Sequence, residues 1–363
     1  MSLATDIAPV PDVKVARAAR RERWHTRINR SASFLELLGF GWLVPLMRIA
    51  AGDSMRRQGV ELWQQLGVPL VAIVLFLGAW AWLAPKVQTS LGALPGPVQV
   101  WLQTKNLWED HLAERQKEAA FYERQAKRNA EALAKNPNFE AKFRPYTGKP
   151  TFIDQIVTSL ETVFTGFLFA TIIAVPLGVL SGLSVAFNAA LNPLVQIFKP
   201  VSPLAWLPLV TMVVSALYTS ADPILPKSFL VSAITVTLCS LWPTLINSAV
   251  GVASIDKDLL NVGRVLRLTW PKKIVKLVLP SSLPLIFTGM RLSLGVGWMV
   301  LIAAEMLAQN PGLGKFVWDE FQNGSSASLA KIMVAVLTIG IIGFLLDRAM
   351  LALQASFTHA ANR

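Results

Sequence analysis

Six long apolar runs constrain the fold of this chain more than any other feature of its sequence. Each run holds 17 to 25 residues and at most two charged side chains. An α-helix needs about 20 apolar residues to cross the hydrocarbon core of a bilayer. We therefore predict an all-α integral membrane protein with about six transmembrane helices. The runs are Val68–Ala84, Val163–Leu183, Val201–Leu217, Phe229–Val250, Leu283–Leu307 and Ile332–Met350.

The charge of the chain has a simple explanation in such a protein. The formal net charge is +12, while only 15% of the residues are charged and 53% are hydrophobic. Lys and Arg gather at the cytoplasmic ends of membrane spans, so we expect a lipid bilayer and no nucleic acid as a partner. The one cysteine, Cys239, lies inside a run and cannot form an intrachain disulfide.

The basic residues also predict the orientation and the parts of the chain. Residues 1–60 carry ten Lys and Arg, which predicts a cytoplasmic N-terminus, with an interfacial helix over Phe34–Ala50. Residues 61–85 form the first span, and residues 86–151 are then a hydrophilic insertion on the periplasmic side. Residues 152–355 form the core, with a cytoplasmic loop at 253–280. Six spans place both termini in the cytoplasm.

The insertion is rich in helix-forming Ala, Glu, Lys, Arg and Gln, as in "LWEDHLAERQKEAAFYERQAKRNAEALAKN". Pro137, Pro145 and Pro150 break the pattern. We expect either a solvated helical hairpin or a docking surface for an external partner.

The loop "NVGRVLRLTWPKKIVKLVLP" combines an apolar stripe with a basic side. Ile255, Leu259, Val262 and Leu266 recur at helical spacing, with Ser254 as the expected N-cap. Thr269 then begins a second helix. Six basic residues lie between Lys257 and Lys276. The pattern suits either a helical hairpin on the anionic leaflet or a stripe inserted into a partner's groove.

The loop resembles the cytoplasmic "EAA" loop of ABC importer permeases. Asn261-Val262-Gly263 stands in the Glu-Ala-Ala place, Leu277 in the Ile place and Leu279-Pro280 in the closing Leu-Pro place. Arg267 stands where the family pattern has Gly, so the turn between the two helices is the part that departs.

The flanking spans resemble the same family over residues 150–350. "GFLFATIIAVPLGVLSGLS" is similar to the span that opens the core of these permeases. "LPSSLPLIFTGMRLSLGVGWMVLIAAEML" resembles the nitrate, sulfonate and taurine branch. "FKPVSPLAWLPL", "LWPTLINSAVGV" and "GKFVWDEFQNG" resemble its nitrate, bicarbonate and cyanate sub-branch.

This resemblance implies a type I importer bundle in the bacterial inner membrane, whose gating the loop couples to a partner. The expected partners are cytoplasmic ATPase subunits, which carry the ATP and Mg, a periplasmic or lipid-anchored binding protein and a second copy of the chain. The expected coupling residues are Asp258, Leu259, Asn261, Val262, Gly263, Arg264, Leu266, Leu277, Leu279 and Pro280. Gly263 is expected to permit close approach to the ATPase.

The chain itself carries no motif for catalysis. "PGLGKF" lacks the spacing and the hydroxyl of a phosphate-binding P-loop. His25, His111 and His359 are far apart and lie outside the apolar runs. We therefore expect no enzyme, no cofactor and no metal site on this chain.

Polar residues inside the apolar runs are the candidates for a substrate pathway. Arg291 can offer planar donors to an oxyanion or serve as a structural partner. The hydroxyl and amide residues can instead bond between helices, and Trp298 can belong to an interface belt, the core or a gate. The candidates are Thr211, Ser215, Thr235, Ser240, Thr244, Asn247, Arg291 and Trp298.

Two functional classes remain open. The first is the permease subunit of an ATP-driven importer for a small inorganic anion, with nitrate first and nitrogen assimilation as its role. Nitrite, bicarbonate, cyanate or a sulfonate remain possible substrates. The second class is a self-contained carrier or channel for small anions, which usually shows repeated halves.

Overall fold

The computed structural model describes residues 24, 26, 28, 32, 41–89, 92–136, 140–141, 143–219 and 224–361. Within these residues all regular secondary structure is helical apart from a short antiparallel ribbon, in which Gln88 pairs with Ala93. The predicted all-α class is confirmed. The helices are α2 Leu43–Ala50, α3 Met55–Leu62, α4 Val68–Leu83, α5 Pro97–Lys135, α6 Phe152–Leu183, α7 Val185–Phe198, α8 Pro203–Leu217, α9 Lys227–Ala253, α10 Lys257–Val265, α11 Trp270–Lys273, α12 Leu279–Ala308, α13 Leu313–Asn323 and α14 Ser326–Ala361. The minor elements are the π-helical turns η1 Trp63–Gly67 and η3 Ile274–Val278, the 3-10 turn η2 Ala84–Lys86, and the strands β1 Gln88–Thr89 and β2 Gly92–Ala93.

Among the described residues, five helical stretches are long and apolar enough to cross a membrane. They are Met55–Lys86, Phe152–Leu183, Lys227–Ala253, Trp270–Ala308 and Ala327–Phe357. Five of the six predicted spans fall within them. The sixth, Val201–Leu217, is not a straight span: α7 and α8 form a pair bent by 101°. Pro200 and Pro203 stand at the break, and the 15-residue α8 reaches only about 22 Å.

The chain divides into two compact units. One comprises residues 1–79 with Arg348–Ser356, and the other comprises Trp80–Asp347 with Phe357–Arg363. The predicted insertion therefore packs in the same unit as most of the core. Residues 68–79 of α4 belong to the first unit and residues 80–83 to the second, and α4 has no buried residue. The predicted interfacial helix overlaps α2, and residues 34–40 of it lie outside the described residues.

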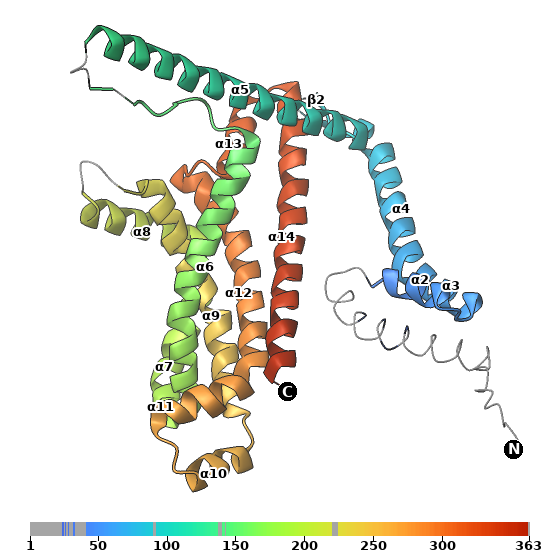
Figure 1. Cartoon of the computed structure of the whole chain (residues 1–363), viewed down its shortest axis with the longest axis vertical. Helices are drawn as coiled ribbons and strands as arrows, with labels where there is room; N and C mark the ends of the chain where they lie inside the picture. The colour runs from blue at the N-terminus through green and yellow to red at the C-terminus, as the bar shows by residue number, and fades with distance from the viewer. Residues whose placement is uncertain are drawn as a thin grey trace, which may run out of the picture. The chain divides into compact units, whose positions relative to one another are not determined.

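Glycines allow the helices of the core to pack closely. On α6, a Cβ at Gly178 would lie 2.6 Å from the Leu245 carbonyl oxygen of α9, and one at Gly182 would lie 2.6 Å from that of Ala249. On α12, a Cβ at Gly289 would lie 2.7 Å from Asn247 Cβ of α9. Small residues give membrane helices this close approach. The core is therefore built from α6, α9 and α12, which lie side by side (Figure 1).

A buried carboxylate links three helices at one end of this core. Glu305 of α12 is fully buried, and Ser159 Oγ of α6 lies 2.8 Å from each of its oxygens. The Gly314 N–H donates to Glu305 over 2.9 Å, and the Leu313 N–H donates to Ser159 Oγ over 2.8 Å. A Cβ on Gly312 would collide with the carboxylate. Glu305 thus joins α6, α12 and the Gly-rich start of α13.

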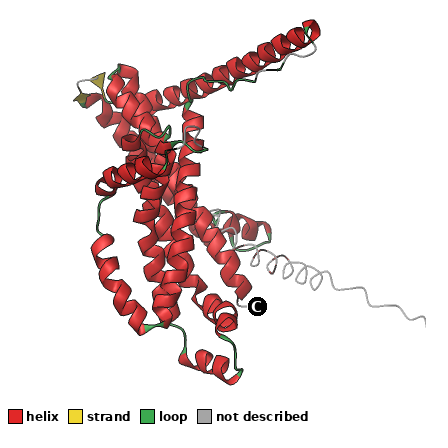
Figure 2. Ribbon diagram, turned by 90° about the vertical axis from the view of Figure 1, so that its left-hand side faces the viewer, coloured by secondary structure: helices red, strands yellow, loops and turns green. Residues whose placement is uncertain are grey.

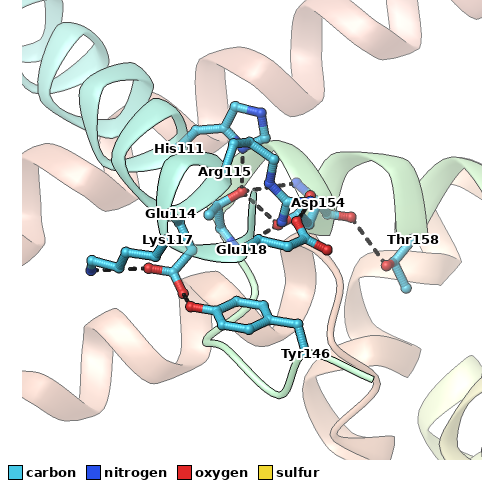
Figure 3. A network of polar contacts seen from close by, with 9 residues as sticks. His111, Glu114, Arg115, Lys117, Glu118, Tyr146, Asp154 and Thr158 are labelled. Carbon is cyan, nitrogen blue, oxygen red and sulfur yellow. Dashed lines mark hydrogen bonds and ion pairs between the residues drawn. The ribbon is translucent and has the colours of Figure 1, made fainter. Parts of the chain in front are cut away.

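The hydrophilic insertion is one helix with an extended return segment, so the expected helical hairpin is wrong. α5 has 39 residues, and residues 143–150 run back along it without helical structure. The Arg144 N–H donates to Gln125 Oε1 over 2.8 Å, and the Tyr146 phenol donates to Glu114 over 2.7 Å. Figure 3 shows the bond between the Tyr146 phenol and Glu114, which together with Gln125 holds the return segment on α5. Pro145 and Pro150 disfavour a second helix in this segment.

Candidate functional site

The predicted loop is a helical hairpin whose first helix is α10. Asp256 caps it, since its Oδ1 accepts from the Asp258 N–H over 2.9 Å. The expected cap, Ser254, instead donates to the Gly251 carbonyl over 3.0 Å and still belongs to the preceding turn. Asp258 lies in the first turn of α10, where a carboxylate interacts favourably with the helix dipole.

The end of α10 has the turn geometry that a glycine usually provides. Arg267 has a φ of 45°, which is the left-handed region. The Leu268 N–H donates to the Gly263 carbonyl over 3.1 Å, and the Arg267 N–H donates to that of Arg264 over 2.9 Å. These two bonds define a Schellman cap. Arg267 therefore replaces the glycine of the family pattern but keeps the left-handed backbone conformation that a glycine usually adopts in such a turn.

The apolar residues of α10 divide between two sides. Val262, Val265 and Leu266 expose 50%, 81% and 64% of their surface, and Leu259 is also exposed. Ile255 precedes the helix, so it does not share the stripe and packs instead on a cluster with Val179, Val252, Leu277 and Val278. We name the exposed set Leu259, Val262, Val265 and Leu266 the α10 stripe. Val265 was missed in the sequence because it lies one position off the apolar repeat.

Gly263 faces the interior of the hairpin. It is buried, and a Cβ there would lie 3.2 Å from Leu277 Cδ1. Leu277 and Leu279 belong to the same inner cluster, and Pro280 stands in the first turn of α12. This contact gives Gly263 a role within its own chain, and its approach to the ATPase stays a prediction. The glycine brings α10 close to η3 of its own chain.

The outer polar residues of the hairpin complete its surface. Asp258, Asn261 and Arg264 are exposed, and Arg264 donates to Asn261 Oδ1 over 3.3 Å. Lys257, Arg267, Lys272 and Lys276 are also exposed. The hairpin thus presents an apolar stripe bordered by basic side chains.

Three of the four polar candidates on α9 are hydrogen-bonded within α9 or to α12. Thr235 is buried and donates to the Val231 carbonyl over 2.8 Å, and buried Thr244 donates to Ser293 Oγ over 2.8 Å. Asn247 donates to the Pro243 carbonyl over 2.8 Å. Ser240 is buried, and no hydrogen-bond partner is found for its hydroxyl among the described residues. These bonds stabilise the packing of α9, and the part of these residues in a substrate pathway stays a prediction.

The remaining candidates lie on other helices. Thr211 and Ser215 are exposed on α8, where Thr211 donates to the Leu207 carbonyl over 2.8 Å. Trp298 is buried and donates to the Ile339 carbonyl of α14 over 3.0 Å. Trp298 is thus a core residue that joins α12 to α14, while Thr211 and Ser215 stand on the exposed side of α8.

Arg291 is held by an acidic partner from the last helix. Its Nε bonds to Asp347 Oδ1, and its Nη2 donates to Asp347 Oδ2 over 2.8 Å. The two side chains remain 38% and 39% exposed. They line a cavity of about 240 Å³ together with Leu294, Gly295, Trp298, Gly343 and Leu346. The guanidinium thus holds a carboxylate through two charge-assisted bonds at this cavity.

Comparison with known proteins identifies the family. Residues 174–359 match the family described as "Binding-protein-dependent transport system inner membrane component". The chain belongs to this family of membrane permeases. The expected fold class is therefore confirmed, and the permease family is one of transport subunits rather than enzymes.

Several curated relatives resemble the permease. It is 34% identical to the bicarbonate transport system permease protein CmpB of Synechococcus elongatus, over 83% of this chain and 94% of that protein. It is 33% identical to the nitrate import permease protein NrtB of Synechocystis, over 81% and 90%. For NrtB of Leptolyngbya laminosa the identity is 37%, and the match covers 53% of this chain and 64% of that protein.

A solved structure of the MetNI methionine ABC transporter in an inward-facing conformation matches 58% of the permease and 96% of the MetNI chain. The TM-score is 0.48 and the sequence identity is 16%.

Proposed function

We propose that this permease moves a small inorganic anion inward, nitrate first, and that ATP hydrolysis on a separate subunit drives it. The observation that carries the proposal is the α10 stripe. Four apolar side chains stand exposed on a short helix that is capped at both ends and anchored by Ile255. An amphipathic helix of this kind fits a hydrophobic groove on a partner protein.

The anchoring of the loop supports a mechanical role. Leu277 and Val278 of η3 are buried against Val179 of α6 and Val252 of α9. η3 continues directly into α12. A force applied to α10 therefore reaches α6, α9 and α12 through packed side chains, and movement of the loop can turn the core helices as rigid bodies.

The choice of substrate rests on the curated relatives and on Arg291. Relatives of similar identity are named for nitrate and for bicarbonate. Both substrates are small planar oxyanions, which suit the planar donors of a guanidinium. The cavity beside Arg291 and Asp347 is a place where such an anion can compete with the carboxylate. Thr211 and Ser215 on α8 are further candidates for the pathway.

The proposal includes the rest of the assembly. ATP and Mg bind the cytoplasmic ATPase subunits, and a periplasmic or lipid-anchored binding protein delivers the anion. A second copy of this chain completes the pathway. The basic residues 1–60 and the basic hairpin support cytoplasmic termini in the bacterial inner membrane.

The test is ATP hydrolysis by the permease reconstituted with candidate ATPase and binding-protein partners, with nitrate, bicarbonate, cyanate and taurine added in turn. We expect nitrate to stimulate hydrolysis several-fold and Val262→Asp to abolish that stimulation. Thr269→Asp adds the same charge to an exposed residue of the hairpin outside the stripe, where Asp also suits the start of a helix, and it is expected to retain the stimulation. Stimulation by bicarbonate alone would change the substrate. Anion flux without any ATPase would support the self-contained carrier.

A further inference from the structure

The first half of α5 carries an apolar side that nothing in the described part of the chain covers. Trp101 and Trp108 expose 62% and 54% of their surface, and Val98, Leu102 and Leu112 are also exposed. These five residues share one side of the helix at spacings of three, four and seven residues, and the charged residues Lys105 and Glu109 lie on the same side. We call them the α5 apolar side.

The other sides of the same helical segment have different environments. Val100 and Leu107 are buried on the side that packs against the protein. Asn106 and Asp110 are exposed on a polar flank. The segment therefore has one side for protein, one for water and one apolar side without a partner, whereas a helix surrounded only by water would not combine these three sides.

The chain topology places both ends of this segment at the same membrane surface. One candidate span ends at Lys86 and the next begins at Phe152, and consecutive spans leave and re-enter the bilayer on one side. Near the first end, Trp80 Nε1 donates to the Pro95 carbonyl over 3.2 Å.

At the other end, α5 is bound to the start of α6. His111 Nδ1 lies 2.7 Å from Thr151 Oγ1, and Arg115 donates to Asp154 over 2.9 Å. Residues 97–115, about 27 Å long as a helix, must therefore run along the membrane surface. α5 lies across the end of α6 rather than beside it in both views (Figures 1 and 2).

We propose that the α5 apolar side lies in the interfacial layer of the lipid bilayer, as an amphipathic surface helix on the side where α6 begins. Trp favours this layer because its ring is apolar and its N–H is polar. Lys105 lies within the apolar side, 5.7 Å from the Trp101 ring centre, and can reach the headgroups along its apolar stem.

The composition of α5 changes where the helix passes α6. Beyond Leu112, the same side continues as Gln116, Glu123 and Lys127 with small alanines between them. The tryptophans and large aliphatic residues therefore stop near the point where α5 reaches the core. This boundary favours a lipid surface over a protein partner that would follow the whole helix.

The experiment uses nitroxide labels on the full-length permease in lipid nanodiscs, in a Cys239→Ser background. Labels at Val98→Cys and Leu112→Cys report the apolar side, and labels at Asn106→Cys and Asp110→Cys report the polar flank. The readout is the ratio of collisions with dissolved oxygen to collisions with a water-soluble nickel chelate. We expect this ratio to be at least threefold higher for the first two labels than for the flank labels.

Two results would overturn the proposal. Equal access of the nickel chelate to all four labels would mean that water covers the apolar side. Labels at residues 98 and 112 shielded from both reagents would mean that a protein covers it. A further variant, Trp101→Gln with Trp108→Gln, is expected to raise the nickel accessibility of the Leu112 label.

Discussion

Gly263 of α10 lies directly over Leu277 of η3, where a Cβ on the glycine would stand 3.2 Å from the leucine Cδ1. The two residues set the distance between the two arms of the hairpin. Gly263 thus determines the shape of the loop, and the α10 stripe on the outside determines what the loop can contact.

This contact predicts size compensation across the hairpin. Gly263→Trp should separate α10 from η3 and reduce co-purification of the ATPase at least tenfold, because the ring cannot fit above Leu277. Gly263→Trp with Leu277→Ala should recover part of the binding, since the smaller side chain makes room. Leu277→Ala alone is the control. Failure of the double variant to recover any binding would mean that Gly263 acts through the partner.

The left-handed residue at the end of α10 predicts that a glycine there stabilises the hairpin. In this conformation a non-glycine residue destabilises the folded state by about 1–2 kcal/mol. Replacing it by glycine removes this cost, but the greater backbone freedom of glycine in the unfolded state offsets part of the stabilisation. Arg267→Gly should therefore slow backbone hydrogen exchange in residues 257–268 by a few-fold. Arg267→Ala also removes the charge but keeps the strained φ of 45°, so it should give no such protection.

Several parts of this fold could be predicted from the sequence because they depend on local patterns. The apolar runs predicted five of the spans, and the repeat Leu259, Val262, Leu266 predicted the exposed side of α10. The bend between α7 and α8 was not predicted, because Val201–Leu217 was expected to be a span of its own and the prolines at the break do not give its angle.

The long-range contacts could not be predicted in this way. Arg291 and Asp347 are 56 residues apart, and no periodicity links them. The same holds for Tyr146 and Glu114, since the return segment has no pattern of its own and depends on side chains of α5. Such contacts are set by how the helices pack, which the local sequence does not encode.

The ion pair between α12 and α14 predicts a double-mutant result that separates two roles of Arg291. Arg291→Gln should destabilise the permease by on the order of 1–3 kcal/mol, because it removes a charged hydrogen-bond partner of Asp347. Arg291→Gln with Asp347→Asn should restore the melting temperature through a neutral pair.

Transport by the stable double variant then decides the role of Arg291. We expect anion uptake to remain at least tenfold below that of the unaltered permease, because the guanidinium donors are gone. Normal uptake by the double variant would mean that the pair only holds α12 against α14.

The bond between Glu114 and Tyr146 predicts that the return segment leaves α5 at low and at high pH. The hydrogen bonds from Tyr146 and Lys117 lower the pKa of Glu114, and the bond to this carboxylate raises the pKa of Tyr146. Stability from a lowered Glu pKa is present above about pH 4.3 and is lost as the pH falls through the lowered folded value. Stability from the raised Tyr pKa is present below about pH 10 and is lost above it.

The distance between nitroxides at Glu123→Cys and Phe143→Cys, in the Cys239→Ser background, measures this docking. We expect a narrow distribution at pH 7 and a broad one below about pH 4. Tyr146→Phe should broaden the distribution already at pH 7 because it removes the bond. A distribution that stays narrow in Tyr146→Phe would show that Gln125 and the backbone of Arg144 suffice to hold the segment.

The glycine contact between α6 and α9 predicts a large effect from one methyl group. At Gly178 a Cβ would meet the Leu245 carbonyl oxygen and Ser248 Cβ at 2.6 Å, and backbone atoms of a packed helix cannot move aside. Overpacking of this kind costs about 1–3 kcal/mol, so Gly178→Ala should lower the melting temperature in detergent by several degrees. Gly340→Ala on α14 is the matched control, because nothing lies within 4 Å of its Cβ position. There the better helix propensity of alanine should leave the stability equal or higher, and equal losses in both variants would contradict the packing argument.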